Sequence, residues 1–328
     1  MRTEIIAEIA NAHQGNPDIA IEIAQKAIDS GADAIKFQMY TADDLLVSTH
    51  KRYQHFKDQS FSKNDWDYIF TSIDTTKTKV YLDIFGFESF SISQHFDVYG
   101  YKLHFSDLGN EPLLKQLAAT GKDILIGSGG ATIAEIDNAI KIIENIGDNK
   151  ITLLHGFQAY PTKIEDTNLE RLKYFKNCFG DKVILGLSDH IEGDNLFSKV
   201  LPMMALPYGI NVIEKHVTVN RAEKGVDYYS SLDMPDFKDF INVFRESEKA
   251  IGYPENYSDD ELKYRKTVKK KWFCNKDLKE GNIVTDHDLV MKRDDSEKAS
   301  LEIEDILNHT LTKNIKKDTL FNKSFFNK

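Results

Sequence analysis

The sequence predicts a (β/α)8 barrel followed by a small second domain. Eight short apolar runs rich in isoleucine and valine occur in the first 252 residues, and amphipathic segments with helical spacing follow most of them. Buried parallel strands that alternate with helices over about 250 residues are typical of this barrel. An open, doubly wound sheet is the alternative, but no Gly-x-Gly-x-x-Gly pattern follows the first run, and this favours the barrel.

The first strand and helix show the pattern on which this prediction depends. Residues 5–10 form an apolar run, and Asn16 before Pro17 predicts a helix start, with a capping side chain and then proline at the first helical position. Apolar residues recur at helical spacing up to Ile28, and Gly31 predicts the end of the helix. Further strands are predicted at 34–39, 80–85, 101–105, 124–128, 151–156, 183–188 and 212–219, and helices at 112–120, 132–146 and 235–251.

The pattern changes after Gly252. Residues 253–265 are mostly polar and predict a linker, whereas residues 266–328 contain short strand-like runs and turns such as Lys279-Glu280-Gly281-Asn282. We therefore expect a barrel domain at 1–252, a linker at 253–265 and a small β-rich domain at 266–328.

Charge is distributed unevenly between these parts. The whole chain has 42 basic and 52 acidic side chains and a net charge of −10, which argues against a nucleic acid or an anionic membrane as partner. Residues 266–328 carry 14 basic and 11 acidic side chains, a net charge of +3, so residues 1–265 carry −13. The basic module either docks on an acidic barrel mouth, its own or a partner's, or has a solvated face.

Cysteine usage and the amino terminus predict the compartment. Cys178 and Cys274 lie far apart without a metal-binding spacing, and the first residues lack the apolar segment of a signal peptide. No stretch reaches the roughly 18 apolar residues that a membrane span requires. We expect a soluble cytoplasmic protein with no membrane partner.

Polar residues interrupt or follow the apolar runs near their carboxyl ends, where barrel enzymes place their active sites. These residues are Glu8, Lys36, Gln38, Asp83, Lys102, His104, Asp107, His155, Gln158, Tyr160, Ser188, Asp189, His190, Glu214 and His216. Burying charges is costly unless they are paired or ligated, so the cluster indicates a polar site and not an ordinary core.

Two histidines predict a metal site. His190 and His216 end adjacent strands, where their imidazoles can share a divalent ion and leave positions open for water and substrate. For His155, a core histidine and a site residue remain equally good interpretations.

Two lysines predict an anionic ligand. Lys36 and Lys102 lie within strand-like runs, which favours a phosphate or carboxylate ligand over a surface salt bridge. Glu8 and Asp107 are candidates for acid/base or hydroxyl-binding work, and the alternative is that they neutralise these lysines.

Several motifs, in this order, resemble the sialic acid synthase family. They are Ala7-Glu8-Ile9 with Gly15, Gly31-Ala32-Asp33-Ala34-Ile35-Lys36-Phe37-Gln38, Tyr160-Pro161-Thr162, Gly186-Leu187-Ser188-Asp189-His190 and Ile213-Glu214-Lys215-His216. The carboxyl-terminal segment resembles that family's antifreeze-like (SAF) domain through Asn275-Lys276-Asp277-Leu278-Lys279-Glu280-Gly281 and Asp288-Leu289-Val290-Met291-Lys292-Arg293.

The resemblance implies a condensation of phosphoenolpyruvate with an N-acylated amino-hexose such as N-acetylmannosamine, giving a nine-carbon 2-keto acid and phosphate. It also implies a divalent metal on His190 and His216, most often Mn²⁺, with Mg²⁺ or Co²⁺ as alternatives. It further implies a domain-swapped homodimer in which Arg293 of the SAF domain reaches the partner's barrel mouth.

Site roles follow from the same resemblance. The catalytic candidates are Glu8, Lys102, Asp107 and His216, and the substrate-binding candidates are Lys36, Gln38, Asp83, Gln158, Tyr160, Ser188, Asp227 and Arg293. Among them Lys36, Lys102 and Ser188 match phosphoenolpyruvate-side positions. Glu8, Gln38, Tyr160 and Asp227 match sugar-side positions.

This chain departs from the family pattern mainly on the phosphoenolpyruvate side. Asp83 stands where threonine is usual, Phe105 where serine is usual and Gln158 where asparagine or serine is usual, while Asp107 is one methylene shorter than the usual glutamate. An aspartate beside a phosphate would repel it by about a kcal/mol or more. Two alternatives therefore remain: a related synthase or aldolase with another donor or sugar, of legionaminic or pseudaminic acid type, and a non-catalytic sugar-binding paralogue.

Overall fold

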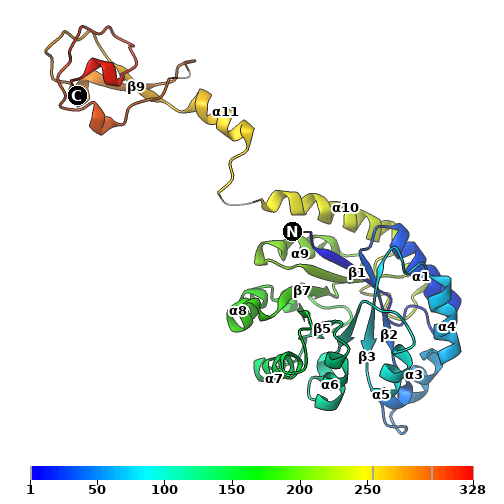
Figure 1. Ribbon diagram of the computed structural model, residues 1–328. Coiled ribbons are helices and arrows are strands. Elements are labelled where there is room, and N and C mark those ends of the chain that lie inside the picture. Colours follow the sequence, from blue (N-terminus) through cyan, green and yellow to red (C-terminus); the bar gives the residue numbers. More distant parts are fainter. Residues whose placement is uncertain (1, 253–254, 297, 328) are drawn as a thin grey trace. The chain divides into compact units, whose positions relative to one another are not determined.

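The computed structural model describes residues 2–252, 255–296 and 298–327, and the chain divides into two compact units, Met1–Gly252 and Tyr253–Lys328. The first unit is a closed barrel of eight parallel strands in sequence order, in which β8 pairs with β1 (Figure 1). The predicted (β/α)8 barrel is confirmed. Its strands are β1 (Glu4–Glu8), β2 (Ala34–Met39), β3 (Lys79–Ile84), β4 (Gly100–Leu103), β5 (Asp123–Gly127), β6 (Ile151–His155), β7 (Ile184–Asp189) and β8 (Val212–His216).

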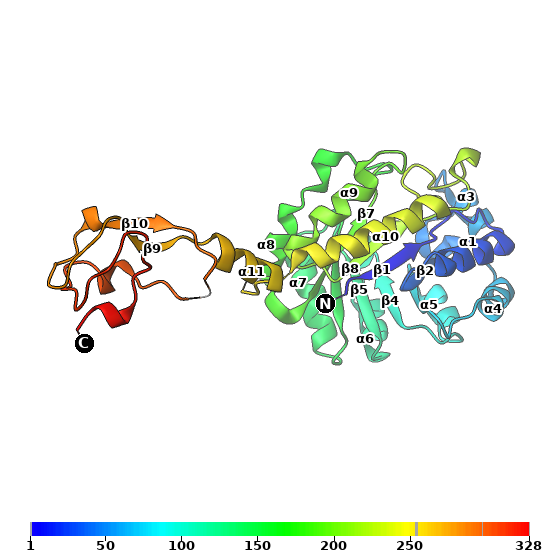
Figure 2. The same cartoon turned by 90° about the horizontal axis from the view of Figure 1, so that it is seen from above.

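Helices surround the barrel. Helix α10 contacts both α1 and α9 and so closes the ring (Figures 1 and 2). The helices are α1 (Pro17–Asp29), α2 (Ala42–Leu45), α3 (Tyr53–Gln59), α4 (Lys63–Ser72), α5 (Phe87–Ser93), α6 (Glu111–Ala119), α7 (Ile133–Glu144), α8 (Glu170–Phe179), α9 (Phe197–Met204) and α10 (Met234–Ile251).

Local sequence sets the ends of these elements. Helix α1 begins after Asn16, whose side chain accepts a hydrogen bond from the Asp18 amide at 2.9 Å, as the sequence predicts. Strand β1 ends at Glu8, earlier than predicted, because Ala10 adopts a left-handed backbone with φ of 45°. The predicted helices near residues 112, 132 and 235 correspond to α6, α7 and α10.

The inside of the barrel begins with an apolar layer. Alternate residues of a strand face opposite sides, so one set points into the barrel and the other packs against the helices. The inward apolar cluster consists of Ile6, Ala34, Tyr81, Leu125, Leu154 and Val212. A much larger cluster, which includes Ile5, Ala7, Ile35 and Leu82, joins the strands to the helices.

The second unit has its own small core. Strands β9 (Lys271–Cys274) and β10 (Leu289–Lys292) form an antiparallel pair, shown side by side in Figure 2. The buried cluster consists of Cys274, Leu278, Val284, Ile306, Leu311, Ile315, Phe321 and Phe325. Helix α11 (Asp259–Val268), capped by Ser258, occupies the latter half of the segment for which a linker was predicted.

In the described ranges 2–252, 255–296 and 298–327, no helix has the length and apolar character that crossing a membrane would need.

Candidate active site

Five charged side chains from five strands meet inside the barrel, and each is at most 2% exposed. Lys36 of β2 forms an ion pair with Glu8 of β1, and its Nζ lies 3.2 Å from Glu214 Oε2 and 3.4 Å from Asp83 Oδ2. Lys102 Nζ of β4 lies 3.0 Å from Glu214 Oε1 and 3.3 Å from Asp83 Oδ2. The three carboxyl groups therefore surround both lysines, and we call these five residues the charged layer.

Strand register explains why residues so distant in sequence converge. Glu8 lies directly opposite Lys36 in the β1–β2 pair, and Asp83 lies opposite Lys102 in the β3–β4 pair. The charged layer follows the apolar layer by two residues, for example Glu8 after Ile6, so both share the inward face. It thus lies toward the carboxyl ends of the strands, where barrel enzymes hold their substrates.

Electrostatic coupling distinguishes the members of the charged layer. Burial raises the pKa of Glu8 to about 7, and the positive charge of Lys36 opposes that rise only in part. Burial also acts to raise the pKa of Glu214, but Lys102 and Lys36 outweigh it and hold that pKa well below its usual range. Glu8 can therefore take up or release a proton near neutral pH.

Ser188 joins this layer. Its hydroxyl donates a hydrogen bond to Glu214 Oε1 at 2.7 Å. Its neighbour Asp189 instead pairs with buried Lys215. Of the two, Ser188 is thus the residue placed beside the lysines.

The two predicted metal-binding histidines lie together. The ring centroids of His190 and His216 are 5.0 Å apart, and the Tyr160 ring packs edge-on against them at 5.2 and 5.6 Å. Both nitrogens of His190 and Nδ1 of His216 are buried without a hydrogen-bond partner in the described chain. Burial lowers the pKa of His190 to about 3 and also lowers that of His216, so both rings are neutral at physiological pH.

These features fit a divalent metal site. A metal binds the neutral form of imidazole, and orphaned buried nitrogens are the atoms that a metal would satisfy. In the ranges described, no group of three or more His, Cys, Asp and Glu side chains is arranged to hold a metal. A metal on this pair would therefore keep its remaining positions for water and substrate.

Gln38 and Asp227, both predicted on the sugar side, are joined through Asn11. The Asn11 side-chain amide donates to Gln38 Oε1 at 3.3 Å, and the Asn11 backbone amide donates to Asp227 Oδ2 at 3.2 Å. The Tyr40 hydroxyl donates to Asn11 Oδ1 at 2.6 Å. Asn11 and Tyr40 are absent from the sequence prediction, although each stands shortly after the carboxyl end of a strand.

Comparison with known proteins shows the family to which this chain belongs. The NeuB family profile matches residues 23–256 of this chain. The chain belongs to the NeuB family. An uncharacterized protein of Methanocaldococcus jannaschii is 34% identical over 261 residues, which cover 77% of this chain and 73% of that protein.

Relatives of the NeuB chain with named activities are synthases, which supports an enzymatic function. The N,N'-diacetyllegionaminic acid synthase of Campylobacter jejuni is 28% identical over 337 residues, covering 97% of this chain and 98% of the relative. The sialic acid synthetase of Leptospira borgpetersenii, solved with citrate, shares the fold with a TM-score of 0.73, 24% identity and coverage of 82% and 93%. A putative spore coat polysaccharide biosynthesis protein E of Chromobacterium violaceum has a TM-score of 0.83, 19% identity and 99% coverage of both chains.

Three predicted site residues of this NeuB protein remain to be placed, Asp107, Gln158 and Arg293. Asp107 lies in a short 3-10 helix (Phe105–Asp107), where its Oδ2 accepts from the Ser106 hydroxyl at 3.0 Å. The Gln158 side chain contacts the His104 ring. Arg293 lies in the second unit directly after β10.

Phe105, at the position where the family usually has serine, packs over Gly130. A Cβ on Gly130 would lie 3.0 Å from the Phe105 ring, which is a tight contact, and the φ of Gly130 is +92°, a backbone conformation that favours glycine. The aromatic ring therefore belongs to a close-packed wall.

Ser128 is a buried polar residue that is not among the sequence-predicted candidates. It directly follows β5, and its buried hydroxyl has no hydrogen-bond partner among the described residues. The signal was its position at the end of the predicted strand 124–128.

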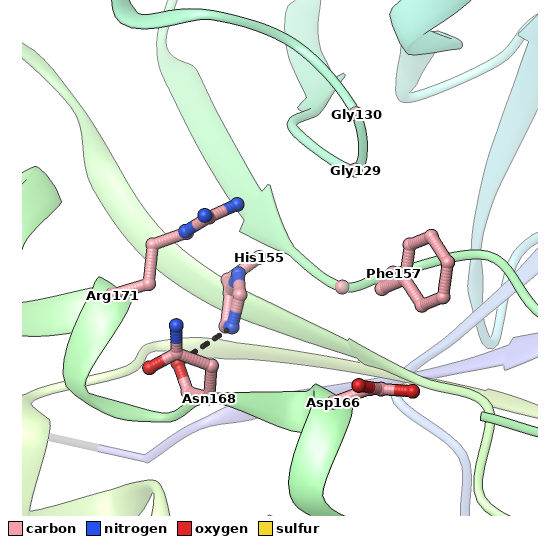
Figure 3. A pocket seen from close by; sticks show the side chains of 8 residues that line it. Gly129, Gly130, His155, Phe157, Asp166, Asn168 and Arg171 are labelled. Carbon is pink, nitrogen blue, oxygen red and sulfur yellow. Dashed lines mark hydrogen bonds between the residues drawn. The ribbon is translucent and has the colours of Figure 1, made fainter. Parts of the chain in front are cut away.

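A cavity of about 290 Å³ lies where β5 and β6 end (Figure 3). It is lined by Gly129, Gly130, His155, Gly156, Phe157, Asp166, Asn168 and Arg171. His155 Nε2 lies 2.6 Å from the Thr167 carbonyl oxygen and 3.1 Å from that of Asn168. These bonds attach His155 to the loop before α8, which favours the interpretation of His155 as a structural histidine.

Proposed function

We propose that this protein is a nonulosonic acid synthase that condenses phosphoenolpyruvate with an N-acyl amino-hexose, giving a nine-carbon 2-keto acid and phosphate. The observation that carries the proposal is the pair of buried lysines, Lys36 and Lys102, in the same barrel mouth as the neutral His190 and His216, which have buried ring nitrogens without a hydrogen-bond partner among the described residues. The relatives named as legionaminic and pseudaminic acid synthases support a product of this class.

The lysines would bind the donor. Lys36 and Lys102 would supply two ammonium groups for a phosphate and a carboxylate, and Ser188, whose hydroxyl is hydrogen-bonded to Glu214, lies beside them. C3 of phosphoenolpyruvate would form the new bond with the aldehyde carbon of the sugar. Water would then add at C2 before phosphate leaves.

The histidines would hold the metal, which we assign as Mn²⁺ with Mg²⁺ or Co²⁺ as alternatives. When bound, the metal would polarise the aldehyde of the sugar. Tyr160 packs on both imidazoles and so limits their rotation. Glu8, with a pKa of about 7, would hold or release a proton beside the reacting groups, and Asp107 remains a second acid/base candidate.

Phosphate release from phosphoenolpyruvate tests the proposal directly. The assay contains Mn²⁺ and a panel of N-acetylmannosamine and diacetamido-trideoxyhexoses, and mass spectrometry identifies the product. We expect release that depends on one sugar, with formation of a nine-carbon keto acid. No release from folded, metal-loaded protein with any sugar would overturn the proposal.

The metal assignment has its own control. His216→Ala should lose bound metal, measured by elemental analysis, and metal-dependent turnover, while circular dichroism stays unchanged. Full turnover in this variant would refute the metal role of His216.

A synthase or aldolase with a different donor is the second candidate. Asp83 favours it, because its carboxylate lies 3.4 and 3.3 Å from the two lysine nitrogens that would otherwise bind a phosphate. Formation of a keto-acid product from a donor other than phosphoenolpyruvate, detected by the same mass spectrometry, would support this candidate.

We also propose that the protein acts as a domain-swapped homodimer in which Arg293 serves the partner's site. The net charges of −13 in residues 1–265 and +3 in residues 266–328 support such docking. Light scattering should give twice the chain mass of 37.5 kDa. Mixing Arg293→Ala with His216→Ala should restore activity, and a monomer or no restoration would contradict the proposal.

A further inference from the structure

We propose that Asn11 is a positioning residue that fixes which hydrogen-bonding groups Gln38 and Asp227 present to the acceptor sugar. The inference rests on the proposed function, since it assumes that these two residues face the sugar. It assigns to Asn11 the selection of acceptors that carry an N-acylamino group.

Asn11 is 8% exposed and uses three polar groups within the protein. Its backbone amide binds Asp227, its side-chain nitrogen binds Gln38, and its side-chain oxygen accepts from Tyr40, at 3.2, 3.3 and 2.6 Å. The Asn11 side chain therefore connects Gln38 and Tyr40, and the Asn11 backbone amide holds Asp227 of the loop after β8. Replacing the side chain alters the orientation of Gln38 directly and that of Asp227 only through a shift of the Asn11 backbone.

Tyr40 sets the direction of this network. Its ring is held edge-on by Phe56 at 5.6 Å and by Phe85 at 6.1 Å, and its side chain is buried. Burial and the nearby Asp227 raise the pKa of the Tyr40 phenol, so its hydroxyl stays protonated and donates. Because Asn11 Oδ1 accepts that proton, the amino half of Asn11 must face Gln38.

Gln38 is oriented as a consequence. Its Oε1 accepts from Asn11, so its Nε2 is the half that is left to donate to a ligand. In the described part of the chain, the Gln38 amino group has no protein acceptor. Gln38 therefore offers N–H groups to the site.

Asp227 offers the opposite polarity. Asn11 binds Oδ2, and no donor in the described ranges binds Oδ1, which leaves that oxygen to accept from a ligand. The loop that carries Asp227 fits closely against the loop after β1, because a Cβ on Gly225 would lie 2.9 Å from the Gln14 side-chain nitrogen. The position of Asp227 thus depends on the loop that contains Asn11.

A ligand that satisfies both residues must carry an acceptor for Gln38 and a donor for Asp227. An N-acylamino group has both, a carbonyl oxygen and an N–H. A free amine is protonated at neutral pH and offers donors only, so at this position it cannot accept a hydrogen bond from the Gln38 amino group.

Steady-state kinetics of three variants test the inference. Asn11→Ala and Tyr40→Phe should both raise the KM for the sugar that the wild type uses, N-acetylmannosamine or another sugar of the panel. The rise should be at least tenfold for Asn11→Ala. Both should change the KM for phosphoenolpyruvate less than twofold. Asn11→Asp replaces the amino half with an oxygen, so Gln38 must reverse, and the preference for the acylated over the free-amine sugar should fall about tenfold.

Asn149→Ala is the matched control. Its side-chain nitrogen donates to the Lys122 carbonyl at 2.8 Å at the opposite, amino-terminal end of the barrel. It should change neither KM.

The outcomes separate this inference from the proposed function. Equal rises in both KM values for Asn11→Ala, or no rise, overturn the inference while the proposed function stands. If the wild type turns over no sugar, the proposed function fails. Calorimetry with N-acetylmannosamine then tests the role of Asn11 separately. Binding at least tenfold weaker in Asn11→Ala than in the wild type supports the role of Asn11, and equal affinity or no binding by either protein overturns it.

Discussion

Two adjacent layers inside the same barrel have opposite chemistry. Ile6, Ala34, Tyr81 and Val212 belong to the apolar layer, and two residues later on the same strands stand the charged residues Glu8, Lys36, Asp83 and Glu214. The apolar layer removes hydrocarbon from water and stabilises the fold. Burying charges costs desolvation energy that ion pairs generally offset less well than apolar packing would, and we propose that the charged layer carries the chemistry. Variants in the two layers should therefore fail in different ways.

The largest effect is expected from Lys102→Met in the charged layer. Removing this ammonium leaves Glu214 and Asp83 with one buried counter-ion fewer, and losing one partner of a buried pair costs about 3–5 kcal/mol of folding free energy. Loss of one preorganised charge should also lower kcat/KM for phosphoenolpyruvate by at least about 100-fold. Urea unfolding and steady-state kinetics measure both effects, and unchanged kcat/KM would contradict a donor-binding role.

In the apolar layer, Leu154→Ala should reduce stability without affecting the chemistry. Leu154 is 1% exposed, and truncating a buried leucine costs about 2–5 kcal/mol. The protein that remains folded should keep both KM values. A selective loss of substrate affinity in Leu154→Ala would show that the layers are not separate.

Asp83→Thr sharpens the comparison within the charged layer. Asp83 competes with an incoming phosphate for both lysines, so its removal should lower the KM for phosphoenolpyruvate about tenfold, or about 1.4 kcal/mol. Asp97→Asn, at an exposed site near the amino end of β4, is the control and should leave this KM unchanged. A higher KM in Asp83→Thr would mean that Asp83 assists donor binding.

A further expected effect is a pH dependence of the free energy of unfolding due to Glu8. The folded pKa of about 7 lies above the ordinary value of 4.5, so folding favours the protonated form. The contribution of Glu8 to the free energy of unfolding is fully present below pH 4.5 and is lost as the pH rises toward 7. Relative to the wild type, Glu8→Gln should therefore gain free energy of unfolding between pH 4.5 and 7 and no more above it, as measured by urea denaturation. A relative loss over that window would give Glu8 a lowered pKa instead.

Much of the fold could be predicted from the sequence because strand periodicity and helix capping depend on residues close together in the chain. The pair Asn16-Pro17 predicted the start of α1, and the polar residues spaced two apart in apolar runs predicted Lys36 with Gln38 and Glu214 with His216 on shared strands. Strand periodicity and capping act over a few residues, so a single sequence contains them.

Contacts between residues far apart in the sequence could not be predicted from the sequence alone. Asn11 binds Asp227 across 216 positions of sequence, and Asp107, which lies in a 3-10 helix, accepts a hydrogen bond from Ser106. The pKa of Glu8 likewise depends on groups from four other strands. The chain alone specifies which chemical groups stand at the ends of its strands, since that follows from local periodicity. Which of them touch, and with what charge, depends on barrel closure, register and loop conformation, because hydrogen bonds and buried electrostatics act through space over a few ångströms.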